Sequence, residues 1–126
     1  MAISLSRPGA VSLGEAERVF KALANRNRIR ILKLLAARPM CVCELRFVLG
    51  IAQPTVSRHL QALKQAGLIE DQTNGVWTDY RLCFYPKNHW LNPLLKTVTA
   101  LTMVDARLRQ DEKKAKLADR KKLCQR

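Results

Sequence analysis

Two cysteines, Cys41 and Cys43, stand two positions apart in the stretch MCVCELRFVLG, which covers residues 40–50. Their thiolates are soft ligands for thiophilic metals and metalloids, and they are also the reactive groups of redox sensors. The apolar spacing of this stretch is typical of a short amphipathic helix. Side chains two positions apart on an α-helix point about 200° apart, so an undistorted helix cannot direct both thiols at one ion. Either one cysteine only packs, or the helix deforms when a ligand binds both.

The compartment of the protein decides whether these thiols stay reduced. No stretch approaches the roughly 18 apolar residues that a membrane span needs, and Arg7 and Pro8 interrupt any apolar core at the start of the chain. We therefore expect a cytoplasmic protein with no membrane partner. Structural disulfides are rare in the cytoplasm, so we expect all four cysteines, which include Cys83 and Cys124, to be thiols.

The composition indicates one folded domain with an anionic partner. The chain has 126 residues, of which 48% are hydrophobic, and a net charge of +13 with a pI of about 10.3. Such a charge favours a nucleic acid over a membrane surface. An enzyme is not expected, because there is no phosphate-binding loop, no convincing carboxylate pair, and only two histidines, His59 and His89.

Capping residues and apolar spacing predict four helices in the first half of the chain. Ser12 begins a capping box at the start of the first helix. Asn25 or Asn27 caps a second helix, which Pro39 ends. The short helix of the cysteine pair follows, and the stretch IAQPTVSRHLQALKQAG predicts a fourth helix.

The second half predicts a hairpin and a closing helix. The stretches LIEDQT and VWTDYRL flank Asn74-Gly75, a pair typical of a two-residue hairpin turn. A last helix begins near His89 or Asn92 and carries an apolar stripe as far as Leu108. The stripe is longer than a lone helix on a small domain needs. We therefore expect it to pair with a second copy in a homodimer, helped by the first helix.

Together these elements predict a mainly α fold with a β-hairpin wing (α+β). This is a winged helix-turn-helix, dimeric through the first and last helices. We expect a disordered lead at residues 1–11 and a DNA-binding and dimerisation domain at residues 12–108. A basic C-terminal tail, which can be mobile, follows at residues 109–126.

The helix after the turn carries polar side chains where a recognition helix meets base edges. Arg58 can take guanine and Gln53 can take adenine, whereas the hydroxyl side chains between them suit bases or phosphates. An ordinary solvated helix face is the alternative, but the helix-turn-helix context and the net charge favour DNA contact. The predicted DNA-binding residues, the last two of them on the wing, are Gln53, Thr55, Ser57, Arg58, His59, Asn74 and Arg81.

Three stretches closely resemble the ArsR/SmtB family of bacterial metal-responsive repressors: ALANRNRIRILKLL, QPTVSRHLQALKQAGLIE and WTDYRL. The resemblance covers residues 15–108, and CVCEL and YPKNHW are similar to the arsenic-sensing branch in particular. It implies a homodimer that binds an inverted-repeat operator without ligand. It also implies release of that operator when trivalent arsenic (arsenite) or antimony binds, and it implies no structural metal.

For the arsenic-sensing branch, the resemblance implies a Cys-x-Cys pair with a third cysteine three positions later. Cys41 and Cys43 map onto the pair, but the third position here is Arg46. A third sulfur therefore comes from Cys124, from Cys83 or from an exogenous thiol. We rank Cys124 first, because a mobile tail can reach across a dimer, and we expect Cys83 to be a packed residue.

Gathering both thiols of the pair on one ion would unwind about one turn of their helix, which couples metal–sulfur bonding to the DNA-reading element. The alternative function is a repressor of the same fold that senses thiol redox state or persulfide, because Arg46 can lower the pKa of a nearby thiol. The other common site of the family places zinc between paired last helices. It is not expected here, because this last helix offers only His89 and Asp105.

Overall fold

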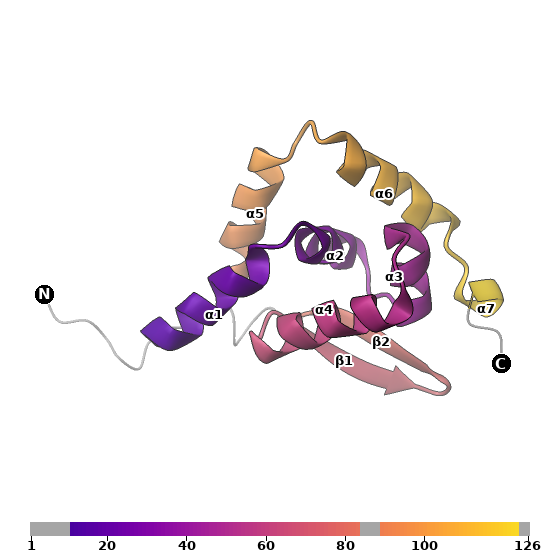
Figure 1. The fold of residues 1–126 in the computed structure, drawn as a ribbon, viewed down its shortest axis with the longest axis horizontal. Coiled ribbons are helices and arrows are strands. Elements are labelled where there is room, and N and C mark those ends of the chain that lie inside the picture. Colours follow the sequence, from indigo (N-terminus) through magenta and orange to yellow (C-terminus); the bar gives the residue numbers. More distant parts are fainter. Residues whose placement is uncertain (1–10, 84–88, 124–126) are drawn as a thin grey trace, which may run out of the picture.

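The computed structural model describes residues 11–83 and 89–123, which form seven helices and one antiparallel hairpin (Figure 1). In chain order the elements are α1 Leu13–Leu23, α2 Arg26–Ala37, α3 Val42–Leu49, α4 Gln53–Gln65, β1 Ile69–Asn74, β2 Trp77–Leu82, α5 Leu91–Leu101, α6 Ala106–Leu117 and α7 Arg120–Leu123. This architecture confirms the predicted fold class. The lead predicted at residues 1–11 lies outside the described residues, except for Val11.

The predicted capping residues begin the first two helices. Ser12 Oγ accepts the backbone N–H of Glu15 at 3.1 Å, and Asn25 Oδ1 accepts the backbone N–H groups of Asn27 and Arg28 at 2.9 and 3.2 Å. Each cap satisfies N–H groups that the first turn of a helix leaves without a partner. The predicted starts of α1 and α2 are therefore confirmed.

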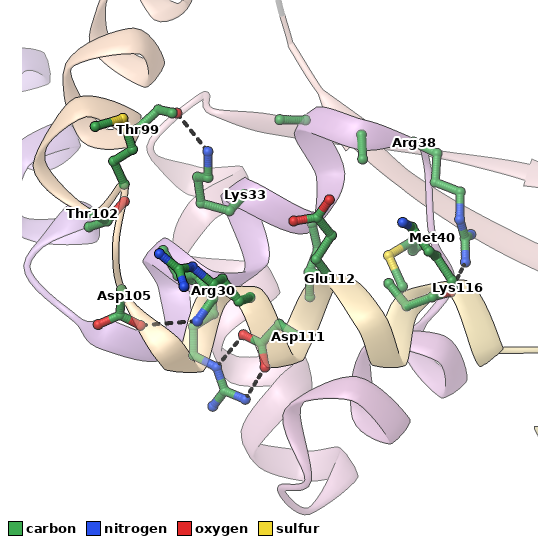
Figure 2. A pocket seen from close by; sticks show the side chains of 17 residues that line it. Arg30, Lys33, Arg38, Met40, Thr99, Thr102, Asp105, Asp111, Glu112 and Lys116 are labelled. Atoms are coloured by element: carbon green, nitrogen blue, oxygen red, sulfur yellow. Dashed lines mark hydrogen bonds and ion pairs between the residues drawn. The ribbon is translucent and has the colours of Figure 1, made fainter.

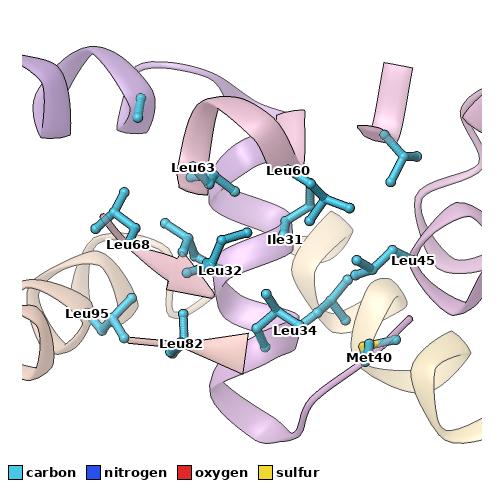
Figure 3. Close-up of a cluster of buried hydrophobic side chains, with 14 of the residues drawn as sticks. Ile31, Leu32, Leu34, Met40, Leu45, Leu60, Leu63, Leu68, Leu82 and Leu95 are labelled. Atoms are coloured by element: carbon cyan, nitrogen blue, oxygen red, sulfur yellow. The ribbon is translucent and has the colours of Figure 1, made fainter. Parts of the chain in front are cut away.

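The hydrophobic core lies between α2, α3, α4 and the hairpin (Figure 3). Ile31 on α2, Leu45 on α3 and Leu63 on α4 have no exposed surface, and Leu95 of α5 packs at the edge of this cluster. Burying each such side chain contributes about 1.5–3 kcal/mol. The core thus holds α3 and α4, the two helices of the helix-turn-helix, in a fixed relation to the wing.

The hairpin turn lies one residue later than the predicted Asn74-Gly75. Asn74 pairs with Trp77 in the strand register, which leaves Gly75 and Val76 as the loop. Gly75 has a φ of 64°, and among the described residues only glycines have a positive φ. A two-residue loop with positive φ only at its first position is a type II′ turn, which favours glycine there.

The last predicted helix is in fact two helices. α5 ends at Leu101 and α6 begins at Ala106, so no single helix continues to Leu108. Asp105 caps α6 by accepting the backbone N–H of Leu108 at 3.0 Å, and aspartate is among the preferred N-cap residues. α6 packs against α2 and α3. The predicted basic tail is therefore a packed helix as far as Leu117.

Candidate functional site

Cys41 does not lie inside the helix that was predicted around it. α3 begins at Val42, and Cys41 is its N-cap, with an extended backbone (φ −90°, ψ 170°). The cause is visible one residue earlier, where Met40 exchanges two main-chain hydrogen bonds with Tyr80 of β2, at 3.1 and 2.8 Å. The predicted helical conformation is therefore wrong for Cys41, whereas Cys43 does lie in the first turn.

Cys41 and Glu44 form a capping box at the start of α3. The Glu44 carboxylate accepts the Cys41 backbone N–H at 3.1 Å, and the Cys41 sulfur accepts the Glu44 backbone N–H. Cys41 is only 3% exposed. This burial raises the pKa of its thiol, and the charge of Glu44 acts in the same direction. Sequence reasoning missed Glu44, although a glutamate three positions after an N-cap is a known signal.

The other cysteines differ in state and position. Cys43 is half-buried and disulfide-bonded, so the expectation that it is a thiol is wrong. Cys83, which follows β2, is a thiol outside any disulfide, and its Sγ donates to Glu70 Oε2 at 3.8 Å. Cys124, the predicted third ligand, lies outside the described residues. Within the described part of the chain, no three His, Cys, Asp or Glu side chains are grouped as a metal site.

Arg38 connects the cysteine end of α3 to α6. Its Nη1 donates to Glu44 Oε2 at 2.8 Å, and its Nη2 donates to the main-chain carbonyl of Ala115 at 3.1 Å. The Glu44 side chain is 6% exposed whereas the Arg38 side chain is 41% exposed, so the pair is buried on its carboxylate side and reaches solvent on its guanidinium side. One oxygen of Glu44 binds the Cys41 N–H and the other binds Arg38. A shift of Cys41 therefore disturbs both contacts.

Arg30 ties the opposite end of α3 to the same helix. Its Nε and Nη2 donate to the two carboxylate oxygens of Asp111 at 2.8 and 2.9 Å, as Figure 2 shows. Nη2 also donates to the main-chain carbonyl of Leu49 at 3.3 Å. These two side chains border a cavity of about 590 Å³ between α2 and the α5–α6 region. Sequence reasoning missed this pair, because its members stand 81 positions apart.

α4 presents its predicted base-reading side chains to solvent. Gln53, Ser57 and Arg58 are exposed and Thr55 is partly exposed, whereas Val56 is buried on the opposite face. Arg58 Nη2 donates to Thr55 Oγ1 at 3.3 Å. This contact is exposed, so a DNA base or phosphate can replace it at small cost.

His59 differs from its neighbours on α4, because it faces α2. Its Nδ1 accepts a hydrogen bond from Arg28 Nε at 3.2 Å. Burial lowers the pKa of the imidazole, and the positive charges of Arg28 and Arg58 lower it further. With Nδ1 engaged as an acceptor, Nε2 is the atom that His59 can offer to DNA.

The two predicted wing residues are placed differently from each other. Asn74 is exposed at the end of β1, whereas Arg81 Nε donates to Glu70 Oε1 at 2.9 Å. Arg81 must leave Glu70, at least in part, before it can bind DNA. The same face of the wing is held by α7, because Arg120 Nη1 donates to Asp79 Oδ1 at 2.6 Å, and Asp79 and Arg81 stand two positions apart on β2. Nothing in the sequence pattern indicated this contact.

An exposed apolar surface joins α1 to α5. A groove of about 350 Å³ between them is lined in part by Phe20, Trp90 and Leu94. Phe20 is 63% exposed and Leu13 is 89% exposed. The Trp90 indole N–H is buried without a hydrogen-bond partner among the described residues. Exposed apolar surface of this kind is typical of a protein–protein interface.

The similarity to known proteins includes the helix-turn-helix. The family model described as bacterial regulatory protein, arsR family, matches residues 25–71. The arsenic resistance transcriptional regulator ArsR1 of Pseudomonas putida is 43% identical over 82 residues, which cover 64% of this chain and 62% of that protein. The arsenical resistance operon repressor of Bacillus subtilis is 39% identical over 71 residues, which cover 56% of this chain and 68% of that repressor. The match therefore spans less than two thirds of the P. putida regulator.

A solved structure supports the same relationship. The homodimeric winged helix-turn-helix DNA-binding domain from Mycobacterium bovis is 33% identical to this chain, with a TM-score of 0.63. The similarity covers 84% of this chain and 94% of that domain. None of the helices in the described residues is long and apolar enough to span a membrane.

Proposed function

This chain belongs to the arsR family of bacterial regulatory proteins, and we propose that it is a transcriptional repressor that trivalent arsenic or antimony releases from its operator. Membership of a family of DNA-binding regulators agrees with the prediction that the chain is not an enzyme. The observation that carries the proposal is the position of Cys41. It caps α3, two positions before Cys43, and its backbone N–H binds Glu44. Arg38 binds the other oxygen of Glu44 and also reaches the main chain of α6.

We infer that the DNA-binding form is a homodimer on an inverted repeat. A two-fold axis through the apolar surface of α1 and α5 would bury Phe20 and Leu13. It would also present two copies of α4 to two half-sites. Gln53, Thr55, Ser57 and Arg58 of each copy would then contact bases or phosphates. Asn74 would contact the backbone from the wing.

The proposed inducer site combines Cys41, Cys43 and Cys124 as reduced thiols. Arsenous acid has three hydroxyl groups, and each thiol replaces one of them. An As–S bond forms, an As–O bond breaks, and the thiol proton leaves with the hydroxyl as water. Cys124 is the proposed third ligand because it directly follows α7, which packs against α3. Soft sulfur ligands suit a thiophilic metalloid better than the oxygen of Glu44 does.

Binding would act on DNA through the capping box. Cys41 must turn its sulfur from the Glu44 N–H towards the metalloid, which leaves that N–H of the first turn without its cap. Glu44 then loses a partner, while Arg38 holds its other oxygen. The first turn of α3 would loosen, and α3 packs directly on α4. Release therefore requires less unwinding than a cysteine pair wholly within a helix would need.

The test measures arsenite-driven release from DNA in excess reductant. Operator duplexes are first selected with the protein from a randomised pool. The wild type should release them, and Cys41→Ser and Cys43→Ser should bind them but not release them. Serine is itself a good N-cap, so Cys41→Ser should keep the start of α3. The matched control is Cys83→Ser, which should respond as the wild type does. Equal release from wild type and Cys43→Ser would exclude the cysteine pair as the sensor.

The second candidate is a thiol redox or persulfide sensor of the same fold, which the disulfide-bonded state of Cys43 favours. The buried Cys41, with its raised pKa, argues against it, because reactive thiols are accessible and readily ionised. A redox sensor would release DNA under peroxide. It would stay bound when arsenite is added to fully reduced protein.

A further inference from the structure

We propose that α7 is a second phosphate-binding element, in which Lys121 and Lys122 supply the positive charge that the wing lacks. This inference rests on the proposed DNA-binding function. It adds a surface that lies outside the recognition helix and the hairpin. Its occupant is the DNA backbone beside the half-site that α4 reads.

The first observation is the charge of the hairpin itself. β1 and β2 carry three acidic side chains, Glu70, Asp71 and Asp79, and one basic side chain, Arg81. Arg81 is already paired with Glu70 at 2.9 Å. Asp71 is in turn paired with Lys64 of α4 at 2.9 Å. The hairpin therefore offers no basic side chain that is not already in an ion pair, so the wing alone cannot hold DNA by charge.

The second observation is that α7 is attached to this hairpin through Asp79 of β2. Arg120 pairs with Asp79 at 2.6 Å, and its guanidinium lies 4.9 Å from the centre of the Trp77 ring. The Asp79 side chain is 15% exposed, so this contact is partly shielded and holds better than a surface pair. α7 also packs against α3. Arg120 therefore neutralises Asp79 of the wing and positions the α7 residues that follow it.

The third observation is where the two lysines lie. Lys121 and Lys122 directly follow Arg120, and both are exposed. Neither forms an ion pair with another described residue. Figure 1 shows α7 and the turn of the hairpin at the same end of the molecule. Two uncommitted ammonium groups beside a wing are suited to bind phosphates, which lysine does as a point charge.

The test compares the salt dependence of DNA binding for two double variants. The probe is a mixed-sequence duplex of about three helical turns, together with the selected operator. The slope of log K against log salt is negative, and each lost phosphate contact should reduce its magnitude by about 0.9. Lys121→Ala/Lys122→Ala should therefore reduce the magnitude by about 1.8 per protomer and weaken binding to both duplexes by the same factor. The matched control, Lys113→Ala/Lys116→Ala, removes the same charge from α6, which packs on α2 and α3 away from the hairpin (Figure 1).

Arg120 provides a second readout. Arg120→Gln keeps both lysines but removes their attachment, so it should also reduce the magnitude of the slope. In the Lys121→Ala/Lys122→Ala background it should change the slope little, because there is no phosphate contact left to position. Equal slopes for Lys121→Ala/Lys122→Ala and its control would overturn the proposal, even if the wild type binds its operator. A wild type without operator preference would instead overturn the proposed function.

Discussion

Arg30 on α2 and Asp111 on α6 form a two-point ion pair inside the protein, at 2.8 and 2.9 Å. Arg30 is 8% exposed and Asp111 is 2% exposed. Asn27 occupies a third nitrogen of the guanidinium, because its Oδ1 accepts Arg30 Nη1 at 2.9 Å. The pair attaches α6 to the centre of the domain, so α6 is part of the structure that carries the helix-turn-helix.

Asp111→Ala should lower the free energy of unfolding by about 3–5 kcal/mol, because it leaves the Arg30 guanidinium buried without its partner. The double variant Arg30→Met/Asp111→Leu removes both charges and should be far less harmful, or even stabilising. Urea unfolding of the three proteins measures this order. If Asp111→Ala unfolded at the same urea concentration as the wild type, the pair would have no structural role.

Arg58→Ala should cost about 1–3 kcal/mol of operator affinity, because Arg58 is the exposed arginine of α4 placed to read a base. Its affinity for a mixed-sequence duplex should fall much less, since base contacts carry the sequence preference. Fluorescence anisotropy with the selected operator and the mixed duplex gives both values. An equal loss on both duplexes would assign Arg58 to the backbone.

Phe20→Asp should convert the proposed homodimer to a monomer. Phe20 is 63% exposed beside the groove of α1 and α5, and a carboxylate there would be buried against apolar surface in the dimer. The matched control is Val76→Asp, which changes a residue 55% exposed at the turn of the wing. Sedimentation velocity at micromolar concentration should show a dimer for the wild type and the control. A monomeric wild type would refute the proposed interface.

The reactivity of the Cys41 thiol should go on rising at pH values above the pKa of an ordinary cysteine. Burial favours the neutral thiol, so the folded pKa lies above the ordinary value of 9.0. A protein with Cys41 as its sole cysteine should therefore be alkylated by iodoacetamide at a rate that still increases above pH 9.0. A short peptide with the same sequence should level off earlier. The same shift means that the thiol's contribution to stability is intact below pH 9.0 and is lost as the pH rises through the folded pKa.

A plateau for the folded protein at or below that of the peptide would contradict the raised pKa. It would then favour the redox function, because a thiol that ionises near neutral pH reacts readily with oxidants.

The features that were predictable from the sequence depend on neighbouring residues. Ser12 and Asn25 begin helices because their side chains bond N–H groups two or three positions later. The break before α6 had a comparable signal in Asp105, which the strong apolar stripe obscured. Arg30 with Asp111, and Arg120 with Asp79, join residues far apart in the chain. No local spacing indicates such contacts, because tertiary packing alone brings these side chains together.

The main-chain bridge between Met40 and Tyr80 connects the wing directly to the start of α3. Met40 is the residue before Cys41, and Tyr80 is on β2, one position after the aspartate that holds α7. A displacement of the Cys41 backbone would therefore move β2 through the hydrogen bonds between Met40 and Tyr80. If Cys41 binds the proposed inducer, one residue separates that site from the wing, and the movement would not have to pass through the recognition helix.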